Sequence, residues 1–315
     1  MHRAAKTAAT ATAAALLLTA CGGNAGEIDD ANAEPPEVTW TIDGDGDIDP
    51  DLEEAVRDIA ERYDGEAAIA LALPGAESGD GPVSAGEVSD ITAWSTSKVP
   101  VAIASLGKSE WVEDLVPAMI SESDNGAAES MWVAMGGETA AAESVNEVLR
   151  AGGDSATKFE AWVAPGETEW ELADQAAFGA NLPCLDGAEP VLEAMGDIID
   201  YQDYGLGEIA GARFKGGWGP DREGGYLIRQ FGVSPAEGGE VGVAIAARPG
   251  DATDETGRDM LDDIAAAIAD HMPRGASCVD NPVSTSARSG TTGASTTGGT
   301  TESGAPDRPT SGNRT

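Results

Sequence analysis

The chain has 315 residues, of which 41% are hydrophobic and 5% aromatic, enough for one large domain or two small ones. Its 18 Lys and Arg against 56 Asp and Glu give a formal net charge of −38, which argues against nucleic acid or an anionic membrane surface as a partner. We interpret the acids as a solvated surface that keeps the chain soluble, with hydration in salty surroundings as the alternative. Because His2 and His271 are the only histidines, a multi-histidine metal site is excluded, and we expect no metal and no cofactor.

The first 20 residues have the pattern of an export signal. A basic start at residues 2–6 precedes an Ala- and Leu-rich run that is too short to span a bilayer. The run ends in Leu-Thr-Ala before Cys21, which resembles the lipobox of bacterial lipoproteins, where the cysteine is lipidated and becomes the mature N-terminus. An ordinary secretory signal with an incidental cysteine is the alternative. We therefore expect residues 1–20 to be a lipoprotein signal peptide and the protein to be extracytoplasmic, anchored to the membrane through Cys21.

The segment after the signal is acidic and lacks an apolar period. Residues 21–49 are rich in Asp, Glu, Ala, Gly and Pro, so we interpret them as a flexible tether. The acids between Asp43 and Glu54 imitate an EF-hand calcium loop, but Ile48 stands where such a loop needs glycine. The reading that we favour is a helix over about residues 50–63 that begins at Asp49 and carries acids in its first turn.

The spacing of apolar residues predicts strands at both ends of the folded part and helices between them. Strands are expected at about 67–73, in a second segment toward Trp94, and at about 209–217, 226–233 and 241–247. Helices are expected at about 111–120, 126–135, 139–150, 170–181, 187–199 and 254–271. This order favours an α+β fold, with an antiparallel sheet built from both chain ends, flanked by helices, and an inserted all-helical lobe.

We place this domain at residues 50–278, before a Ser/Thr/Gly-rich tail at 279–315 that we expect to be disordered. If Cys21 is lipidated, Cys184 and Cys278 remain as an even pair in a protein expected to be exported. This favours a disulfide between the mid-chain helical region and the end of the last helix. Two free buried thiols are the alternative.

Three short motifs occur in order in the folded part. Ser95 and Lys98 stand three residues apart at the start of an apolar helix, so the lysine amine can lie beside the serine hydroxyl and act as its base. Residues 123–125 read Ser-Asp-Asn, and residues 215–218 read Lys-Gly-Gly-Trp at the end of a strand. Each motif alone has an ordinary explanation, as a helix cap, a turn or a strand end. Two of only five lysines in the chain nevertheless fall inside these motifs.

The set Ser-x-x-Lys, Ser-Asp-Asn and Lys-x-Gly resembles that of the serine β-lactamase and DD-peptidase superfamily, and in particular its class A-like branch. The resemblance covers about residues 50–272. It implies that Ser95 attacks a carbonyl carbon and that Lys98 accepts its proton. It also implies that Lys215 acts as a second cation that opposes the charge on Lys98 and attracts an anionic substrate, and that Ser123 relays a proton to the leaving nitrogen.

The resemblance also implies how a substrate would be held. Asn125 would hydrogen-bond both Lys98 and a substrate amide. The backbone N–H groups of Ser95 and Trp218, with Gly217 beside them, would form an oxyanion hole. The implied substrate is a peptide or amide, with peptidoglycan-related compounds as one such class.

Two departures from the family's motifs bear on activity. Gly216 stands where the family has Thr or Ser, so the hydroxyl that would hold a substrate carboxylate is missing. The family's Glu-x-Glu-Leu-Asn loop, whose first Glu activates the deacylating water, is also absent. Counting from Pro-Gly at 165–166 places Thr157 there, and Glu169 and Glu160 are stray candidates. We therefore expect slow β-lactam hydrolysis.

The sequence leaves three hypotheses. The first is an exported, lipid-anchored serine hydrolase that forms an acyl-enzyme at Ser95 with Lys98 as base. The second is a binding or scaffold lipoprotein that keeps the fold with little turnover, motivated by Gly216 and by the missing glutamate. The third is a true class A β-lactamase.

Overall fold

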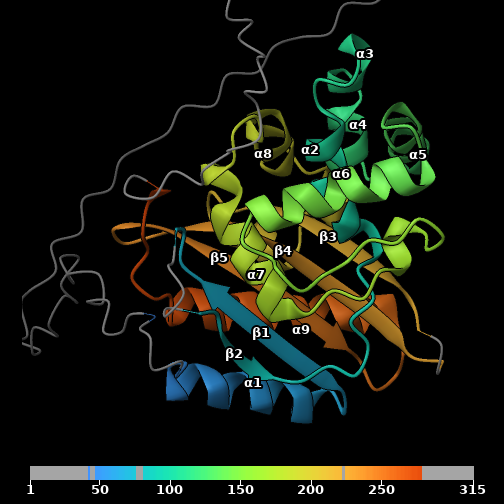
Figure 1. Ribbon diagram of the computed structural model, residues 1–315. Coiled ribbons are helices and arrows are strands. Elements are labelled where there is room, and N and C mark those ends of the chain that lie inside the picture. The colour runs from blue at the N-terminus through green and yellow to red at the C-terminus, as the bar shows by residue number, and fades with distance from the viewer. Residues whose placement is uncertain (1–41, 43–46, 76–80, 222–223, 279–315) are drawn as a thin grey trace, which may run out of the picture. The chain divides into compact units, whose positions relative to one another are not determined.

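A computed structural model describes residues 42, 47–75, 81–221 and 224–278 of the chain. The expected lipidation site at Cys21 and the tail at 279–315 lie outside the described residues. A five-stranded antiparallel sheet has the order β2-β1-β5-β4-β3 (Figure 1). Its strands are β1 (Glu66–Ala72), β2 (Val83–Gly86), β3 (Arg213–Pro220), β4 (Tyr226–Ala236) and β5 (Gly239–Arg248). Because β1 pairs with β5, the two ends of the folded chain meet inside one sheet.

Helices cover both faces of the sheet. Helices α1 (Pro50–Arg62) and α9 (Asp254–Asp270) pack on one face, and α7 (Leu172–Asn181) packs on the other (Figure 1). Alternate residues of β1 point to the two faces, so Ile69 belongs to the buried cluster under α1 and α9, while Ala70 belongs to the cluster under α7. At Gly242 a Cβ atom would lie 2.3 Å from a backbone atom of α7, so glycine allows this close approach. The result is a sheet with one apolar core on each face.

The chain between β2 and β3 forms a helical lobe. Besides α2 (Lys98–Ser105), the lobe contains α3 (Glu110–Glu113), α4 (Val116–Ile120), α5 (Asn125–Ala134), α6 (Glu138–Ala151) and α8 (Glu189–Met195). Helix α2 is buried along most of its length and packs against α4, α5 and α6. The α+β arrangement predicted from the sequence is therefore confirmed, with the sheet built from both chain ends and the lobe inserted between them.

Several elements differ from their predicted bounds: β3 begins at Arg213 rather than at about residue 209, and three further differences have local reasons. The helix expected at about 111–120 is two short helices, because Pro117 lacks an N–H group and begins a new first turn in α4. The strand expected to run toward Trp94 ends at Gly86, where φ is +72° and the chain leaves the sheet. Helix α8 ends at Met195 and is followed by Gly196, a residue of low helix propensity.

A disulfide joins two distant segments of the fold. Cys184 and Cys278 form a disulfide, with Cα atoms 5.4 Å apart, between the 3₁₀ turn η3 (Leu182–Cys184) and the segment after α9.

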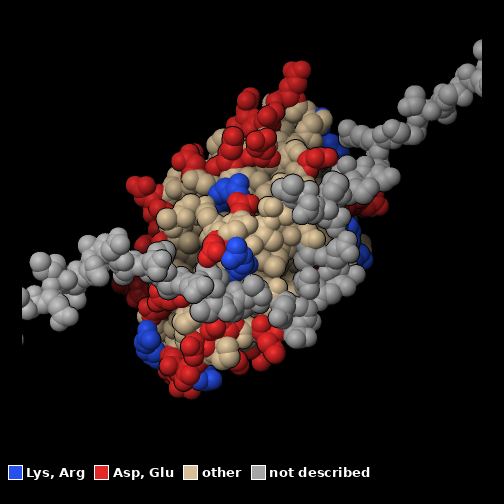
Figure 2. Space-filling model, turned by 90° about the vertical axis from the view of Figure 1, so that its left-hand side faces the viewer, with Lys and Arg blue, Asp and Glu red and all other residues tan. Residues whose placement is uncertain are grey.

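No helix within the described residues is long and apolar enough to cross a membrane. On the face in Figure 2, acidic side chains outnumber basic ones and lie mainly around the margins of an uncharged area.

Candidate active site

Ser95 lies where the sheet meets the helical lobe. It belongs to the 3₁₀ turn η1 (Trp94–Ser97), which continues directly into α2. Trp94 has φ +49°, a left-handed conformation that a bulky residue rarely adopts. The Ser97 hydroxyl donates to the Trp94 carbonyl at 2.7 Å and holds this turn. Backbone strain at the residue before a candidate nucleophile is the kind of feature that clusters at functional sites.

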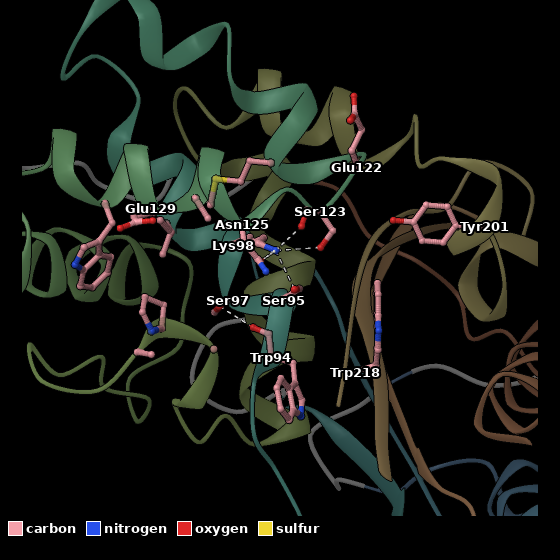
Figure 3. Close-up of a pocket in the computed structure, with 17 residues that line it drawn as sticks. Trp94, Ser95, Ser97, Lys98, Glu122, Ser123, Asn125, Glu129, Tyr201 and Trp218 are labelled. Atoms are coloured by element: carbon pink, nitrogen blue, oxygen red, sulfur yellow. Dashed lines mark hydrogen bonds between the residues drawn. The ribbon is translucent and has the colours of Figure 1, made fainter. Parts of the chain in front are cut away.

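The amine of Lys98 is the centre of the site (Figure 3). Its Nζ atom lies 3.0 Å from Ser95 Oγ, 3.1 Å from Ser123 Oγ and 2.7 Å from Asn125 Oδ1. It also donates to the Ser123 carbonyl at 2.7 Å. Four acceptors surround a group that has only three protons even when it is charged, so one hydroxyl is free to donate to the neutral amine. The structure thus brings the first two motifs together around one nitrogen atom.

The surroundings of Lys98 favour its neutral form. Its side chain is 5% exposed, and burial lowers its pKa from 10.5 to about 8, while the charge of Asp124 opposes this shift. At 1.36 kcal/mol per unit, the shift corresponds to about 3 kcal/mol of destabilisation of the charged amine relative to a lysine in water. An amine with a pKa near 8 is a competent general base at mildly alkaline pH.

Ser123 connects Lys98 with the third motif. Its φ is +61°, so the connection before α5 turns its hydroxyl between the two lysines. Lys215 Nζ lies 3.1 Å from Ser123 Oγ and 2.9 Å from the Gly216 carbonyl. Lys215 is fully buried in β3, and burial, with a contribution from the charge of Lys98, lowers its pKa well below the usual value. Ser123 can therefore pass a proton between Lys98 and a leaving group.

The backbone of β3 passes very close to η1 at Gly217. A Cβ atom at Gly217 would lie 2.8 Å from the Ser95 backbone nitrogen and 2.9 Å from the Ala93 carbonyl oxygen, so only glycine fits. This contact places the next residue, Trp218, beside Ser95 on the wall of the same cavity. The N–H groups of Ser95 and Trp218, which are expected to form the oxyanion hole, thus belong to two segments that are in direct contact.

A buried polar chain positions η1 from behind. The Arg229 guanidinium of β4 donates to Gln175 Oε1 at 2.5 Å and to the carbonyls of Trp170 and Ile91. The Gln175 amide in turn donates to Thr96 Oγ1 at 2.9 Å. Because Thr96 is the second residue of the Ser-x-x-Lys motif, these hydrogen bonds link the sheet and α7 to η1, the turn that carries the candidate nucleophile. Sequence reasoning missed Arg229 and Gln175, because buried polar residues have no local pattern.

A cavity of about 570 Å³ opens over Ser95, Lys98, Ser123 and Asn125. Sequence reasoning also missed four further lining residues, which come from three segments: Glu122, Glu129, Trp132 and Tyr201. Spacing along α5 could have indicated two of them, because Glu129 and Trp132 lie one and two turns after Asn125 on the same helix face. Figure 3 shows Glu129 and Tyr201 on opposite sides of the Lys98 cluster.

The loop expected to carry a deacylating glutamate contributes no carboxylate to this cavity. Its residues on the wall are Ala164, Pro165 and Gly166, so counting to Thr157 was wrong: Thr157 lines a different cavity. Glu160 and Glu169 line that second cavity as well. Within the described part of the chain, the carboxylates that line the Ser95 cavity are instead Glu122 and Glu129, from the α4–α5 connection and from α5.

Two further points concern the missing hydroxyl at Gly216 and the side chains that could hold a metal ion. A Cβ atom at Gly216 would meet its nearest neighbours at 3.7 Å, an ordinary contact, so the missing hydroxyl does not reflect a lack of space for Cβ. The described residues contain no group of three His, Cys, Asp or Glu side chains that could hold a metal ion.

Comparisons with known proteins show which solved structures have a similar fold. No model of a known protein family matches the sequence, and no curated protein is similar to it. Among solved structures, TLA-3 extended-spectrum β-lactamase is similar at TM-score 0.56 and 12% identity, over 70% of this chain and 98% of that chain. A β-lactamase from Chitinophaga pinensis DSM 2588 is similar at TM-score 0.56 and 14% identity, over 70% and 98% of the two chains. A class A β-lactamase from Bacteroides cellulosilyticus DSM 14838 is similar at TM-score 0.56 and 14% identity, over 70% and 96%. The chain therefore has the fold of class A β-lactamases.

Proposed function

We propose that the protein is an exported serine hydrolase that forms an acyl-enzyme at Ser95 on an ester, peptide or amide substrate. The observation that carries this proposal is the position of the Lys98 amine, 3.0 Å from Ser95 Oγ and 3.1 Å from Ser123 Oγ, with its pKa lowered to about 8. A buried amine of this kind can remove the hydroxyl proton. The β-lactamase fold supports the same class of chemistry.

In the proposed acylation, the Ser95 hydroxyl proton moves to Lys98 Nζ as the bond between Ser95 Oγ and the acyl carbon forms. The backbone N–H groups of Ser95 and Trp218 stabilise the negative charge on the carbonyl oxygen. The bond from the acyl carbon to the leaving oxygen or nitrogen then breaks. The leaving group takes the proton of the Ser123 hydroxyl, which Lys98 replaces.

Release of the acyl group is expected to be slower than its formation. Water must attack the acyl carbon, and a positioned carboxylate usually activates it. The loop residues 164–166 on the cavity wall have no such group, and the two carboxylates that do line the cavity, Glu122 and Glu129, are exposed on the α4–α5 connection and on α5. A long-lived acyl-enzyme is the expected result.

The proposal is tested by intact-mass measurement of the purified domain after incubation with 4-nitrophenyl acetate and, separately, with a penicillin. A single adduct with at least one of these probes is expected on the native protein, and none on Ser95→Ala or Lys98→Met. Ser130→Ala is the matched control, since Ser130 is an exposed serine of α5 that bonds its own helix. If no probe leaves an adduct, or if Ser95→Ala reacts like the native protein, the proposal is wrong.

A binding or scaffold lipoprotein is the second candidate. Gly216 and the absence of a loop carboxylate from the cavity favour it, because both would limit turnover. It predicts that ligands bind beside Ser95 without covalent modification. A Ser95-dependent turnover of any ester or amide would remove this candidate.

A class A β-lactamase is the third candidate, and its support is the similarity to solved β-lactamases. It predicts nitrocefin hydrolysis with many turnovers. The sequence made Glu160 and Glu169 the candidate bases, but both line another cavity, so their replacement by Gln should leave any hydrolysis unchanged.

We also propose that the protein is held at the outer side of the membrane by a lipid on Cys21, as the signal pattern of residues 1–20 indicates. Labelling of cells with a radioactive fatty acid should mark the native protein and not Cys21→Ser. An unlabelled native protein would contradict the anchor and leave the proposed chemistry untouched.

A further inference from the structure

The walls of the Ser95 cavity are unusually aromatic for this chain. Four of the residues that line it are Trp94, Trp132, Tyr201 and Trp218, although aromatic residues make up only 5% of the sequence. They come from η1, α5, the 3₁₀ turn η4 (Asp200–Gln202) and β3, so the fold gathers them from four separate segments. Tyr201 is 56% exposed and has no covering element in the described part of the chain. Large apolar side chains kept at a cavity wall indicate contact with a ligand.

The same cavity offers little to attract a negative charge. Lys98 is the one Lys or Arg among its described lining residues, and its amine is already surrounded by four oxygen acceptors of Ser95, Ser123 and Asn125. The charged groups at the mouth are the exposed carboxylates of Glu122 and Glu129. A substrate carboxylate entering this space would meet two like charges in a region where aromatic walls reduce screening by water.

The third motif does not supply the missing positive charge. Lys215 is fully buried, does not line the cavity, and donates to Ser123 Oγ and the Gly216 carbonyl. Burial lowers its pKa well below the usual value, which favours the uncharged amine. Gly216 adds no hydroxyl. Lys215 and Gly216 are the two positions of the third motif that could anchor a carboxylate, and neither presents a charged or hydrogen-bonding side chain to the cavity.

We propose that the substrate is an ester or amide whose acyl part carries an apolar ring and no carboxylate. The ring would pack against Tyr201 and Trp218, while the carbonyl lies between Ser95 and the N–H group of Trp218. This inference rests on the proposed acyl-enzyme chemistry and adds the substrate class. The covalent step is unchanged: the bond from Ser95 Oγ to the acyl carbon forms, the bond to the leaving group breaks, and Lys98 takes the serine proton.

Three 4-nitrophenyl esters test the proposal: the phenylacetate, the acetate, and the ester of 4-carboxyphenylacetic acid at its CH₂-linked carboxyl. The nitrophenolate burst gives the second-order rate constant of acylation, and intact mass gives the adduct. Each rate constant is divided by that ester's own hydrolysis rate in buffer, which removes differences in intrinsic reactivity. We expect the normalised rate of the phenylacetate to be at least ten times that of its 4-carboxy analogue. It should also be at least five times the normalised rate of the acetate.

Variants assign the discrimination to named side chains. Tyr201→Ala changes an exposed residue and should lower the phenylacetate-to-acetate ratio several-fold. Trp111→Ala is the matched control, because Trp111 is exposed on α3 outside the cavity, and its ratio should equal that of the native protein. Replacement of Glu122 and Glu129 together by Gln should raise the rate with the 4-carboxy ester several-fold.

The outcomes separate the substrate class from the chemistry. If none of the three esters forms an adduct at Ser95, the proposed function itself is wrong. If adducts form but the normalised rates agree within twofold, or the 4-carboxy ester reacts fastest, the substrate class is wrong and the acyl-enzyme stands. An unchanged ratio in Tyr201→Ala would likewise overturn the role of the aromatic wall.

Discussion

At the scale of single residues, the site is decided by how two lysines are solvated. Lys98 is surrounded by hydroxyl and amide oxygens and keeps a pKa of about 8, whereas Lys215 is fully buried and held by one hydroxyl and one carbonyl. Both shifts arise mainly from burial, which removes water from the charged form. Lys98 is therefore suited to exchange protons with Ser95, and Lys215 to orient Ser123.

The lowered pKa of Lys98 predicts the pH dependence of acylation. Only the neutral amine accepts the serine proton, and the amine loses its own proton as pH rises through about 8. The acylation rate should therefore increase about tenfold per pH unit below pH 7 and level off above about pH 8.5. Burst kinetics with 4-nitrophenyl acetate between pH 5.5 and 9.5, corrected with Ser95→Ala, measure it. A flat profile across this range would exclude Lys98 as the base.

The cavity wall predicts a gain of function at Ala164. This residue lies on the wall above Ser95 in the loop where the resembled family carries its water-activating glutamate, and its side chain is exposed. Ala164→Glu should accelerate decay of the Ser95 adduct by at least tenfold, because a carboxylate there can take a proton from water. Time-resolved intact mass gives the decay. Ala164→Gln is the control, and equal decay in both variants would show that the position cannot serve the water.

At the scale of elements, the nucleophile turn depends on contacts made far away in the sequence. Strand β3 meets η1 at Gly217, and Arg229 of β4 reaches it through Gln175 and Thr96. The carbonyls of residues 91 and 92, which precede η1, also accept hydrogen bonds from Arg229. These contacts fix the turn before any substrate binds, and preorganisation of this kind is a large part of catalysis.

Gln175→Leu tests this support. It removes a hydrogen bond to a buried guanidinium and should lower the free energy of unfolding by about 2 kcal/mol. Because Thr96 Oγ1 also loses the hydrogen bond that the Gln175 amide donates to it, the acylation rate should fall several-fold. Gln230→Leu is the matched control, since Gln230 is equally buried but bonds the η5 turn (Gly205–Glu208) on the other side of the sheet. Urea unfolding and burst kinetics give both quantities. Equal loss of acylation in the two variants would mean that Gln175 acts only through stability.

At the scale of the whole molecule, the sheet joins the two ends of the folded chain while the site lies at its junction with the inserted lobe. Long-range connections therefore carry much of the stability. The bond between Cys184 and Cys278 closes 94 residues of chain, and Ala276 beside it pairs with Glu240 of β5. A link over so long a loop restricts the unfolded chain strongly.

Loss of the disulfide should lower stability without changing the chemistry. Cys184→Ser with Cys278→Ser, or reduction of the native protein, should lower the free energy of unfolding by about 2–5 kcal/mol. Acylation at low temperature should persist, because neither cysteine lines the Ser95 cavity. Calorimetry with and without reductant provides the comparison, and the double variant should not respond to reductant. An unchanged melting temperature would show that the bond adds no stability.

Much of this protein could be predicted from local patterns in the sequence. Apolar periodicity indicated the helices and strands, and with their order it indicated the α+β fold. The scarcity of Lys and His made Ser95 and Lys98 conspicuous, and Ser123 and Asn125 followed from their motif. These inferences succeed because helix and strand periods, and spacings of three or four residues, are local properties of the chain.

Other properties depended on long-range packing. The aromatic wall unites Trp94, Trp132, Tyr201 and Trp218 from four segments, and the polar chain from Arg229 through Gln175 to η1 crosses the sheet. No sequence spacing relates such residues. Counting along an irregular loop chose Thr157, whereas the packing of the loop on η1 brings residues 164–166 to the cavity. The sequence thus determined which residues have the required chemistry, and tertiary structure decided which of them share a cavity, because burial and proximity arise only when distant segments pack together.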